Sequence, residues 1–261
     1  MRYYIINFLR IAAAIFLICL SAGCGKDTNA IYQDTTMAFV TGESVISTDA
    51  GLTYNITSSN KDLTQEFGTR IYAVCSVEEC LDDAGKTFNV KLLNYTVPIS
   101  GAPLDATAGE FDRSLWQDAV SVNEAWISGG YLNVLCTWIG HRGSSVEQET
   151  ALVYNGTVAD TVSFSLVHNS EGEGLYEDSA SKTDFVTIKK MATFPVQEFL
   201  PSRNVVIRLD WVWHKSDGIY IYPETEPQSE ELEYYFSGDS AAASAEPSTK
   251  AIISPFTTLL P

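Results

Sequence analysis

Val205-Val-Ile-Arg-Leu-Asp-Trp-Val-Trp213 is the stretch with the strongest two-residue alternation in the chain. Its apolar side chains recur at every second position, as in a β-strand that buries one face: Val205, Ile207, Leu209, Trp211 and Trp213. The turn signal Ser216-Asp217-Gly218 follows, and Ile219-Tyr220-Ile221-Tyr222 then returns, which predicts a β-hairpin. No long stretch of the sequence repeats with a period of 3.6 residues, so the pattern predicts an all-β protein.

Alternation of this kind extends over residues 116–223 and predicts an antiparallel β-sandwich. Trp211 and Trp213 share the apolar face of their strand, so we expect them to pack in the core. Tyr220 and Tyr222 follow on the returning strand and form a candidate contact surface. Five earlier strands are expected at Val120–Trp126, Tyr131–Ile139, Thr150–Asn155, Thr161–His168 and Phe185–Ile188.

A separate block of short strands occupies residues 37–98 and predicts a small OB-like barrel. Thr69–Val77 alternates, with Ile71, Ala73 and Cys75 on one face. Residues 99–115 are rich in Gly, Pro and Ala and are expected to link the two domains. The predicted architecture is therefore a small OB-like barrel followed by a β-sandwich.

Residues 224–261 differ in composition, because they carry seven acidic side chains against Lys250 alone. Such a segment is expected to be an acidic, disordered tail. Its apolar end, Ala251–Phe256, leaves open the alternative that it docks on a sheet edge.

The first 23 residues have the pattern of a secretory signal peptide. Arg2 and Arg10 form the positive region, and Ile11–Leu20 is an unbroken apolar run. Ten residues cover about half of the hydrocarbon core of a bilayer, so a cleaved leader is favoured over the alternative of an uncleaved membrane anchor.

The leader ends in Leu20-Ser21-Ala22-Gly23-Cys24, which matches the lipobox of bacterial lipoproteins. Leu20, Ser21, Ala22 and Gly23 are the expected recognition residues of the signal peptidase, and Cys24 is the expected lipidation site. Two or three acyl chains hold a protein durably on a membrane. We therefore expect residues 24–36 to be a tether. We expect the protein to be lipid-anchored in the cell envelope, at the outer membrane, and the sequence does not distinguish between the two leaflets.

Charge and cysteine content limit the possible partners. The net charge is −17, and removal of Arg2 and Arg10 with the leader leaves 14 basic against 33 acidic residues, a net of −19. This field repels phosphate backbones, so we expect no nucleic-acid partner. The mature chain beyond the lipobox keeps three cysteines, of which Cys75 and Cys80 are close enough in sequence to form a disulfide, and Cys136 is expected to be a buried filler.

Two short motifs and the order of segments over Met37–Tyr222 carry a family resemblance. The motifs are Trp126-Ile-Ser-Gly-Gly-Tyr131-Leu-Asn133 and Phe164-Ser-Leu-Val-His168-Asn169. With the lipobox leader, the chain resembles the NigD-like lipoproteins of Gram-negative anaerobes. The resemblance implies an OB-like domain followed by a β-sandwich and a link to bacteriocin immunity. It brings with it no activity and no set of catalytic residues.

A search for catalytic, cofactor and metal motifs predicts none of these sites. The sequence has no G-x-S-x-G motif, no calcium-loop pattern and no Gly-rich phosphate loop in a strand-to-helix setting. His141, His168 and His214 have no acidic partner at a recognisable spacing, and His168 is expected to bond the turn at Asn169. We therefore expect no cofactor, no metal and no catalytic residue.

Two classes of function remain. The first is a non-enzymatic binding protein that contacts an unknown protein or glycan partner. The alternative is a hydrolase of envelope glycans that uses two carboxylates on the sandwich, which would require a pair at a fixed separation in a cleft.

Overall fold

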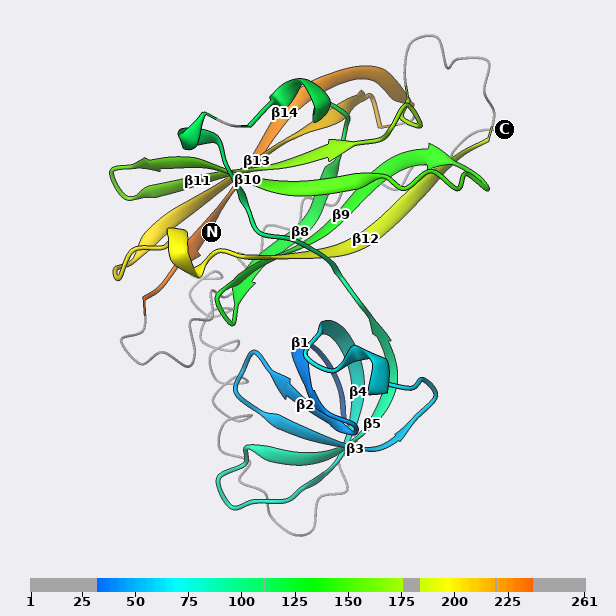
Figure 1. The fold of residues 1–261 in the computed structure, drawn as a ribbon, viewed down its shortest axis with the longest axis vertical. Coiled ribbons are helices and arrows are strands. Elements are labelled where there is room, and N and C mark those ends of the chain that lie inside the picture. The colour runs from blue at the N-terminus through cyan, green and yellow to red at the C-terminus, as the bar shows by residue number, and fades with distance from the viewer. Residues whose placement is uncertain (1–31, 110, 176–183, 219, 237–261) are drawn as a thin grey trace, which may run out of the picture. The chain divides into compact units, whose positions relative to one another are not determined.

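The computed structural model describes residues 32–109, 111–175, 184–218 and 220–236. These residues form strands and short 3-10 helices without an α-helix, and none of their helices is long and apolar enough to cross a membrane (Figure 1). The chain divides into two compact units between Tyr95 and Thr96. The predicted all-β fold, a barrel followed by a sandwich, is confirmed.

The first unit is a closed five-stranded barrel with the order β1-β2-β3-β5-β4. β1 closes the barrel because it pairs antiparallel with both β2 and β4, while β3 and β5 pair in parallel. The 3-10 helix η1 (Thr64–Glu66) lies between β3 and β4. The strands are β1 (Tyr32–Gly42), β2 (Val45–Thr48), β3 (Thr53–Ser59), β4 (Arg70–Cys80) and β5 (Thr87–Thr96).

The barrel unit combines an apolar interior with a buried ion pair at the start of β4. Ile71, Ala73 and Cys75 point inward from β4, as their alternation predicts, and are fully buried. Arg70 is 6% exposed, and its two terminal amino groups donate to both carboxylate oxygens of Asp49. Loss of either partner of such a pair is strongly destabilising, because the remaining charge would be buried without a compensating charge.

The second unit is a two-sheet sandwich. One sheet has the order β14-β13-β11-β10-β7, and the other has the order β6-β12-β9-β8. The longer strands pair antiparallel except for β11 and β13, which pair in parallel, and the two short strands β6 and β7 also pair in parallel with their neighbours. The longer strands are β8 (Ser121–Ser128), β9 (Tyr131–His141), β10 (Glu149–Val158), β11 (Thr161–Asn169), β12 (Phe185–Pro195), β13 (Val205–Ser216) and β14 (Ile221–Tyr234).

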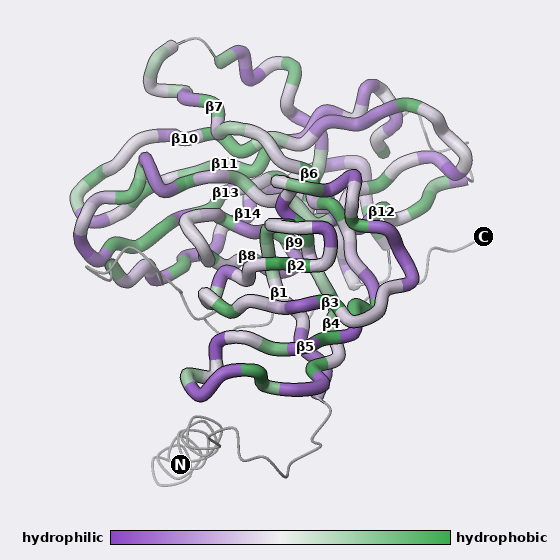
Figure 2. Tube along the Cα trace, turned by 60° about the horizontal axis from the view of Figure 1, so that its bottom comes forward, coloured by the Kyte–Doolittle hydropathy of each residue, from purple (hydrophilic) through white to green (hydrophobic). Residues whose placement is uncertain are grey.

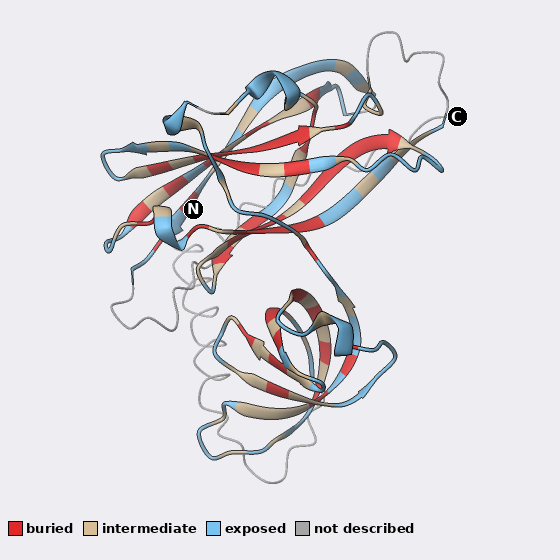
Figure 3. Cartoon of the chain, viewed as in Figure 1, coloured by how far each residue is buried: buried red, intermediate tan, exposed pale blue. Residues whose placement is uncertain are grey.

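The facing sides of the two sheets form the sandwich core. Phe164 and Leu209 from one sheet meet Trp138 and Phe194 from the other, and all four side chains are buried. Hydrophobic and hydrophilic residues alternate along these strands (Figure 2), and buried residues gather on the strands rather than in the loops (Figure 3). Trp211 is buried in the core, and Trp213 packs against it half-buried, as predicted.

The structure corrects the predicted bounds of the tether and of the linker. Tyr32–Thr36, placed in the tether, pair with β4 as the start of β1. Residues 99–105, placed in the linker, contain β6 (Ile99–Ser100) and β7 (Leu104–Asp105), which pair with β12 and β10. Two-residue strands are too short to show alternation, so a sequence pattern cannot distinguish them from a linker.

The predicted acidic tail is wrong for Glu224–Tyr234, which continue β14 along β13. Leu232 and Tyr234 point into the core and are buried, while most of the glutamates are exposed. β14 is the outermost strand of its sheet, and acidic residues and prolines are common on such edges because they prevent further pairing. Tyr235 and Phe236 follow the strand and are exposed, and residues 237–261 of that prediction lie outside the described part of the chain.

Cys75 and Cys80, which are close enough in sequence to form a disulfide, are not bridged to each other, because Cys75 is a free, buried thiol. Both cysteines lie on the continuous strand β4. Five residues of strand separate their Cα atoms by about 17 Å, well beyond the reach of a disulfide. Cys136 is also free and buried, as predicted, and burial raises the pKa of both free thiols to about 12.

Candidate functional site

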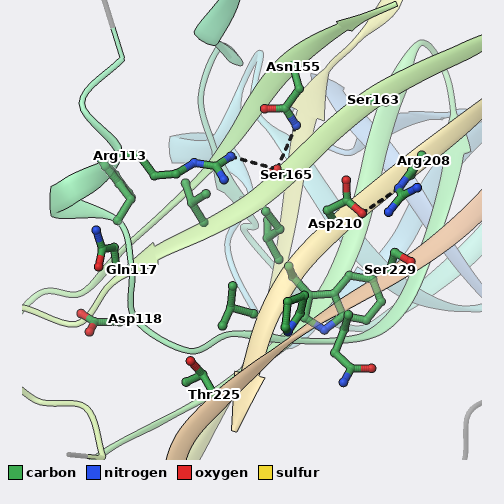
Figure 4. Close-up of a pocket in the computed structure, with 17 residues that line it drawn as sticks. Arg113, Gln117, Asp118, Asn155, Ser163, Ser165, Arg208, Asp210, Thr225 and Ser229 are labelled. Atoms are coloured by element: carbon green, nitrogen blue, oxygen red, sulfur yellow. Dashed lines mark hydrogen bonds and ion pairs between the residues drawn. The ribbon is translucent and has the colours of Figure 1, made fainter. Parts of the chain in front are cut away.

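A groove of about 980 Å³ lies on the sandwich, over the face of the β10–β11–β13–β14 sheet that is turned away from the core (Figure 4). The segment that carries the 3-10 helix η3 (Arg113–Leu115) forms one wall. We call this feature the outer-face groove. Its polar and charged lining includes Arg113, Gln117, Asp118, Asn155, Ser163, Ser165, Arg208, Asp210, Thr225 and Ser229.

Ser165 connects two walls of the groove. Its hydroxyl oxygen accepts hydrogen bonds from Arg113 Nη2 at 3.2 Å and from Asn155 Nδ2 at 2.9 Å (Figure 4). Ser165 is almost fully buried, whereas Arg113 and Asn155 are exposed. The oxygen is an acceptor in both bonds, so the hydroxyl hydrogen stays available to donate to a third group.

Local backbone features place these two donors. Asn155 lies between Tyr154, opposite Phe164, and Gly156, opposite Ser163, so it is the extra residue of a β-bulge. A bulge redirects the side chain that it inserts, and bulges are frequent beside functional sites. Arg113 opens η3, whose preceding Asp112 accepts a hydrogen bond from Ser114 N and caps the turn.

The other end of the groove carries a second arginine. Arg208 Nε donates to Asp210 Oδ1 at 2.8 Å, and this bond raises the pKa of the Arg208 guanidinium. The two residues are neighbours on one face of β13, so the strand itself sets their spacing. No hydrogen bond among the described residues uses the terminal amino groups of Arg208, which leaves them able to donate to a ligand.

The groove is electrically balanced in a strongly acidic chain. Two arginines, Arg113 and Arg208, face two aspartates, Asp118 and Asp210, whereas the whole chain has a net charge of −17. Asp118 Oδ2 accepts hydrogen bonds from both the backbone N–H and the hydroxyl of Ser170, at 2.7 Å each. Arg113 forms no ion pair with any described carboxylate.

The residues proposed from the sequence lie elsewhere. Tyr220 is 51% exposed and Tyr222 is 39% exposed, and both lie beside the β13–β14 turn rather than in the groove. The Tyr222 hydroxyl donates to Asp217 at 2.7 Å. Cys24 and the recognition residues Leu20, Ser21, Ala22 and Gly23 lie outside the described residues. Among the described residues, no group of three His, Cys, Asp or Glu side chains is arranged to hold a metal ion.

His168 differs from its expected role at the Asn169 turn. Its ring is 1% exposed, and its nitrogens bond the side chains of Thr150 and Gln148, both at 3.2 Å. The ring also lies against the indole of Trp138, with centroids 4.8 Å apart. Burial lowers the pKa of His168 to about 4, so the ring is neutral at pH 7.

Comparison with solved structures identifies the architecture. A NigD-like immunity protein from Bacteroides caccae aligns at 15% identity over 80% of this chain and 99% of its own, with a TM-score of 0.56. The resemblance to the NigD-like proteins is confirmed for the fold. The same fold is found in a protein of unknown function from Bacteroides vulgatus, which aligns at 18% identity over 80% of this chain and 94% of its own, with a TM-score of 0.56. It is also found in a candidate lipoprotein from Bacteroides fragilis, which aligns at 13% identity over 80% of this chain and 99% of its own, with a TM-score of 0.56. No protein-family model and no curated protein matches the chain.

Within this NigD-like fold, the sequence contains only an indirect signal for the groove. Ser163 and Ser165 occupy the alternate positions between Val162, Phe164 and Leu166, so their strand predicts that they face away from the core. Their closeness to Arg208 and Asp210 depends on the parallel pairing of β11 with β13, which are not consecutive in the sequence. The pattern within β11 therefore predicts which face the two serines occupy, but it does not predict that this face carries a groove.

Proposed function

We propose that this NigD-like protein is a lipoprotein of the bacterial cell envelope that acts by binding a ligand in the outer-face groove and not by catalysis. Cys24 carries its lipid anchor, and the outer membrane is its location. The hydrogen-bonding set built around Ser165 carries the proposal, because it offers fixed donors on an open face.

The contacts of the two aspartates in the groove favour binding over the alternative of glycan hydrolysis at this site. Asp210 is engaged by Arg208, and Asp118 is engaged by Ser170. A glycosidase needs one carboxyl group that holds its proton near neutral pH, and such groups are found in apolar surroundings. Both aspartates are instead half-buried among polar partners. The Bacteroides caccae neighbour is named an immunity protein, and immunity by capture of another molecule would also be a binding role.

A variant that fills the groove tests the proposed function. Ser163→Trp places an indole on the half-buried floor position of β11, and we expect the soluble Gly25–Pro261 form to lose the envelope protein or glycan that the wild type captures. Pull-down from an envelope extract measures the captured material. Ser202→Trp, on an exposed loop outside the groove, is the matched control and should capture as the wild type does. Equal capture by both variants would contradict the proposal.

The lipid anchor is tested separately. We expect Cys24→Ser to abolish labelling by radioactive palmitate and to move the protein from the detergent phase to the aqueous phase, because each buried methylene contributes about 0.8 kcal/mol to anchoring. Cys136→Ser, which removes a buried thiol instead, should label normally. Unlabelled wild-type protein would contradict the proposed anchor.

A further inference from the structure

The outer-face groove combines three kinds of side chain that together restrict its ligand. Seven of the lining residues are uncharged amides or alcohols, and Trp116 adds a half-buried indole next to the Arg113 turn. Arg113 supplies a guanidinium that no described carboxylate neutralises. The volume of about 980 Å³ is at the upper end of the range for small-molecule sites, so the groove can hold several linked rings.

We propose that the outer-face groove binds an oligosaccharide that carries a carboxylate, with the carboxylate against Arg113. This inference rests on the proposed binding function and names its ligand class. A guanidinium presents paired N–H donors that match the two oxygens of a carboxylate. In a chain with 33 acidic and 16 basic residues, a guanidinium left without an acidic partner is the group that would attract an anion to this face.

The remaining lining suits the sugar rings. Sugar hydroxyls donate and accept at the same time, and amides and alcohols such as Asn155 and Ser229 can satisfy both roles. The Ser165 hydroxyl, already an acceptor from Arg113 and Asn155, has its hydrogen left to donate. An indole such as that of Trp116 offers an apolar face for stacking against a sugar ring.

The aspartates of the groove do not oppose an acidic ligand strongly. Asp210 is paired with Arg208 through Nε, and no hydrogen bond among the described residues uses the two terminal amino groups of that guanidinium. Asp118 is held by the Ser170 backbone and hydroxyl. Each aspartate is therefore screened by a donor of its own, while Arg113 bonds only the neutral Ser165 hydroxyl among the described residues.

A glycan array tests the ligand class. The array carries uronate- and sialate-containing oligosaccharides, each printed beside its carboxyl-reduced counterpart, and the probe is the mature lipoprotein in a sugar-free detergent. We expect wild-type protein to bind acidic members, and to bind their reduced counterparts roughly tenfold to a hundredfold more weakly, which is the loss expected for one charge-assisted hydrogen-bonding pair.

Two variants locate the contact. Arg113→Gln keeps hydrogen-bonding capacity but removes the charge, and it should bind acidic and reduced glycans alike, at the weaker level. Arg203→Gln is the control, because Arg203 pairs with Asp160 outside the groove and its loss should leave the preference unchanged.

Equal binding of acidic and reduced glycans by the wild type, or a preference that survives Arg113→Gln, would overturn the inference. Absence of any glycan binding would overturn it as well. In that last case, capture of a protein that is lost in Ser163→Trp would leave the proposed binding function standing, so the two failures are distinguishable.

Discussion

Replacing Arg70 with methionine is expected to lower the unfolding free energy of the barrel unit by about 3–5 kcal/mol, the usual effect of removing one partner of a buried ion pair. Arg70 donates to both oxygens of Asp49, and the two side chains are only 5% and 7% exposed. Methionine fills most of the volume but leaves the Asp49 carboxylate without its guanidinium. Calorimetric unfolding of the barrel transition measures the loss.

The double variant Asp49→Asn with Arg70→Met is the matched control, and it should recover much of the lost stability because neither charge is then buried alone. Tryptophan fluorescence provides a second control. All five tryptophans lie in the sandwich unit, so its unfolding midpoint should change little in Arg70→Met. A single variant as stable as the wild type would contradict the role assigned to the pair.

Acid is expected to destabilise the sandwich through His168. The pKa of this ring is about 4 in the folded chain against 6.5 for the ordinary value, so the unfolded chain binds more protons between these two values. Unfolding free energy therefore falls as the pH drops from 6.5 to 4, by up to about 3 kcal/mol. Burial lowers the pKa of His214 in the same direction, and Asp118 opposes both shifts.

His168→Gln separates this effect from general acid unfolding. Glutamine can still bond Thr150 and Gln148 but cannot titrate, so the variant should lose less stability than the wild type on acidification. Urea unfolding at pH 7 and at pH 4.5, followed by tryptophan fluorescence, measures the difference. The indole of Trp138 lies against the His168 ring and reports the site directly. An identical pH dependence in both proteins would contradict the assignment.

The all-β class could be predicted because alternation is visible within single strands. Val205, Ile207 and Leu209 are buried on one face of β13 as their spacing predicts, and the turn at Asp217 does return the chain. The prediction of a disordered tail is wrong for β14 because its glutamates dominate the composition of the segment. The strand is nevertheless held in the fold by the buried side chains of Leu232 and Tyr234. Edge strands carry charge for a reason unrelated to disorder, so composition alone misclassifies them.

The groove could not be predicted in the same way, because it depends on how separate segments are placed beside one another. Arg113, Asn155 and Arg208 come from a 3-10 turn, a β-bulge and a strand that are far apart in sequence. A bulge changes which side chain points to which face, and one sequence does not reveal its position. Expected exposure alone points to Tyr220 and Tyr222, and the structure places both side chains away from the groove.

Hydrogen–deuterium exchange on the mature chain, with and without the partner captured from the envelope, tests the central claim most directly. Occupation of the outer-face groove should slow exchange of backbone amides in residues 112–118 and at the bulge around Asn155, because these segments form its wall and floor. Protection confined to the Tyr220–Tyr222 turn or to the barrel strands, with the groove segments unchanged, would contradict the account.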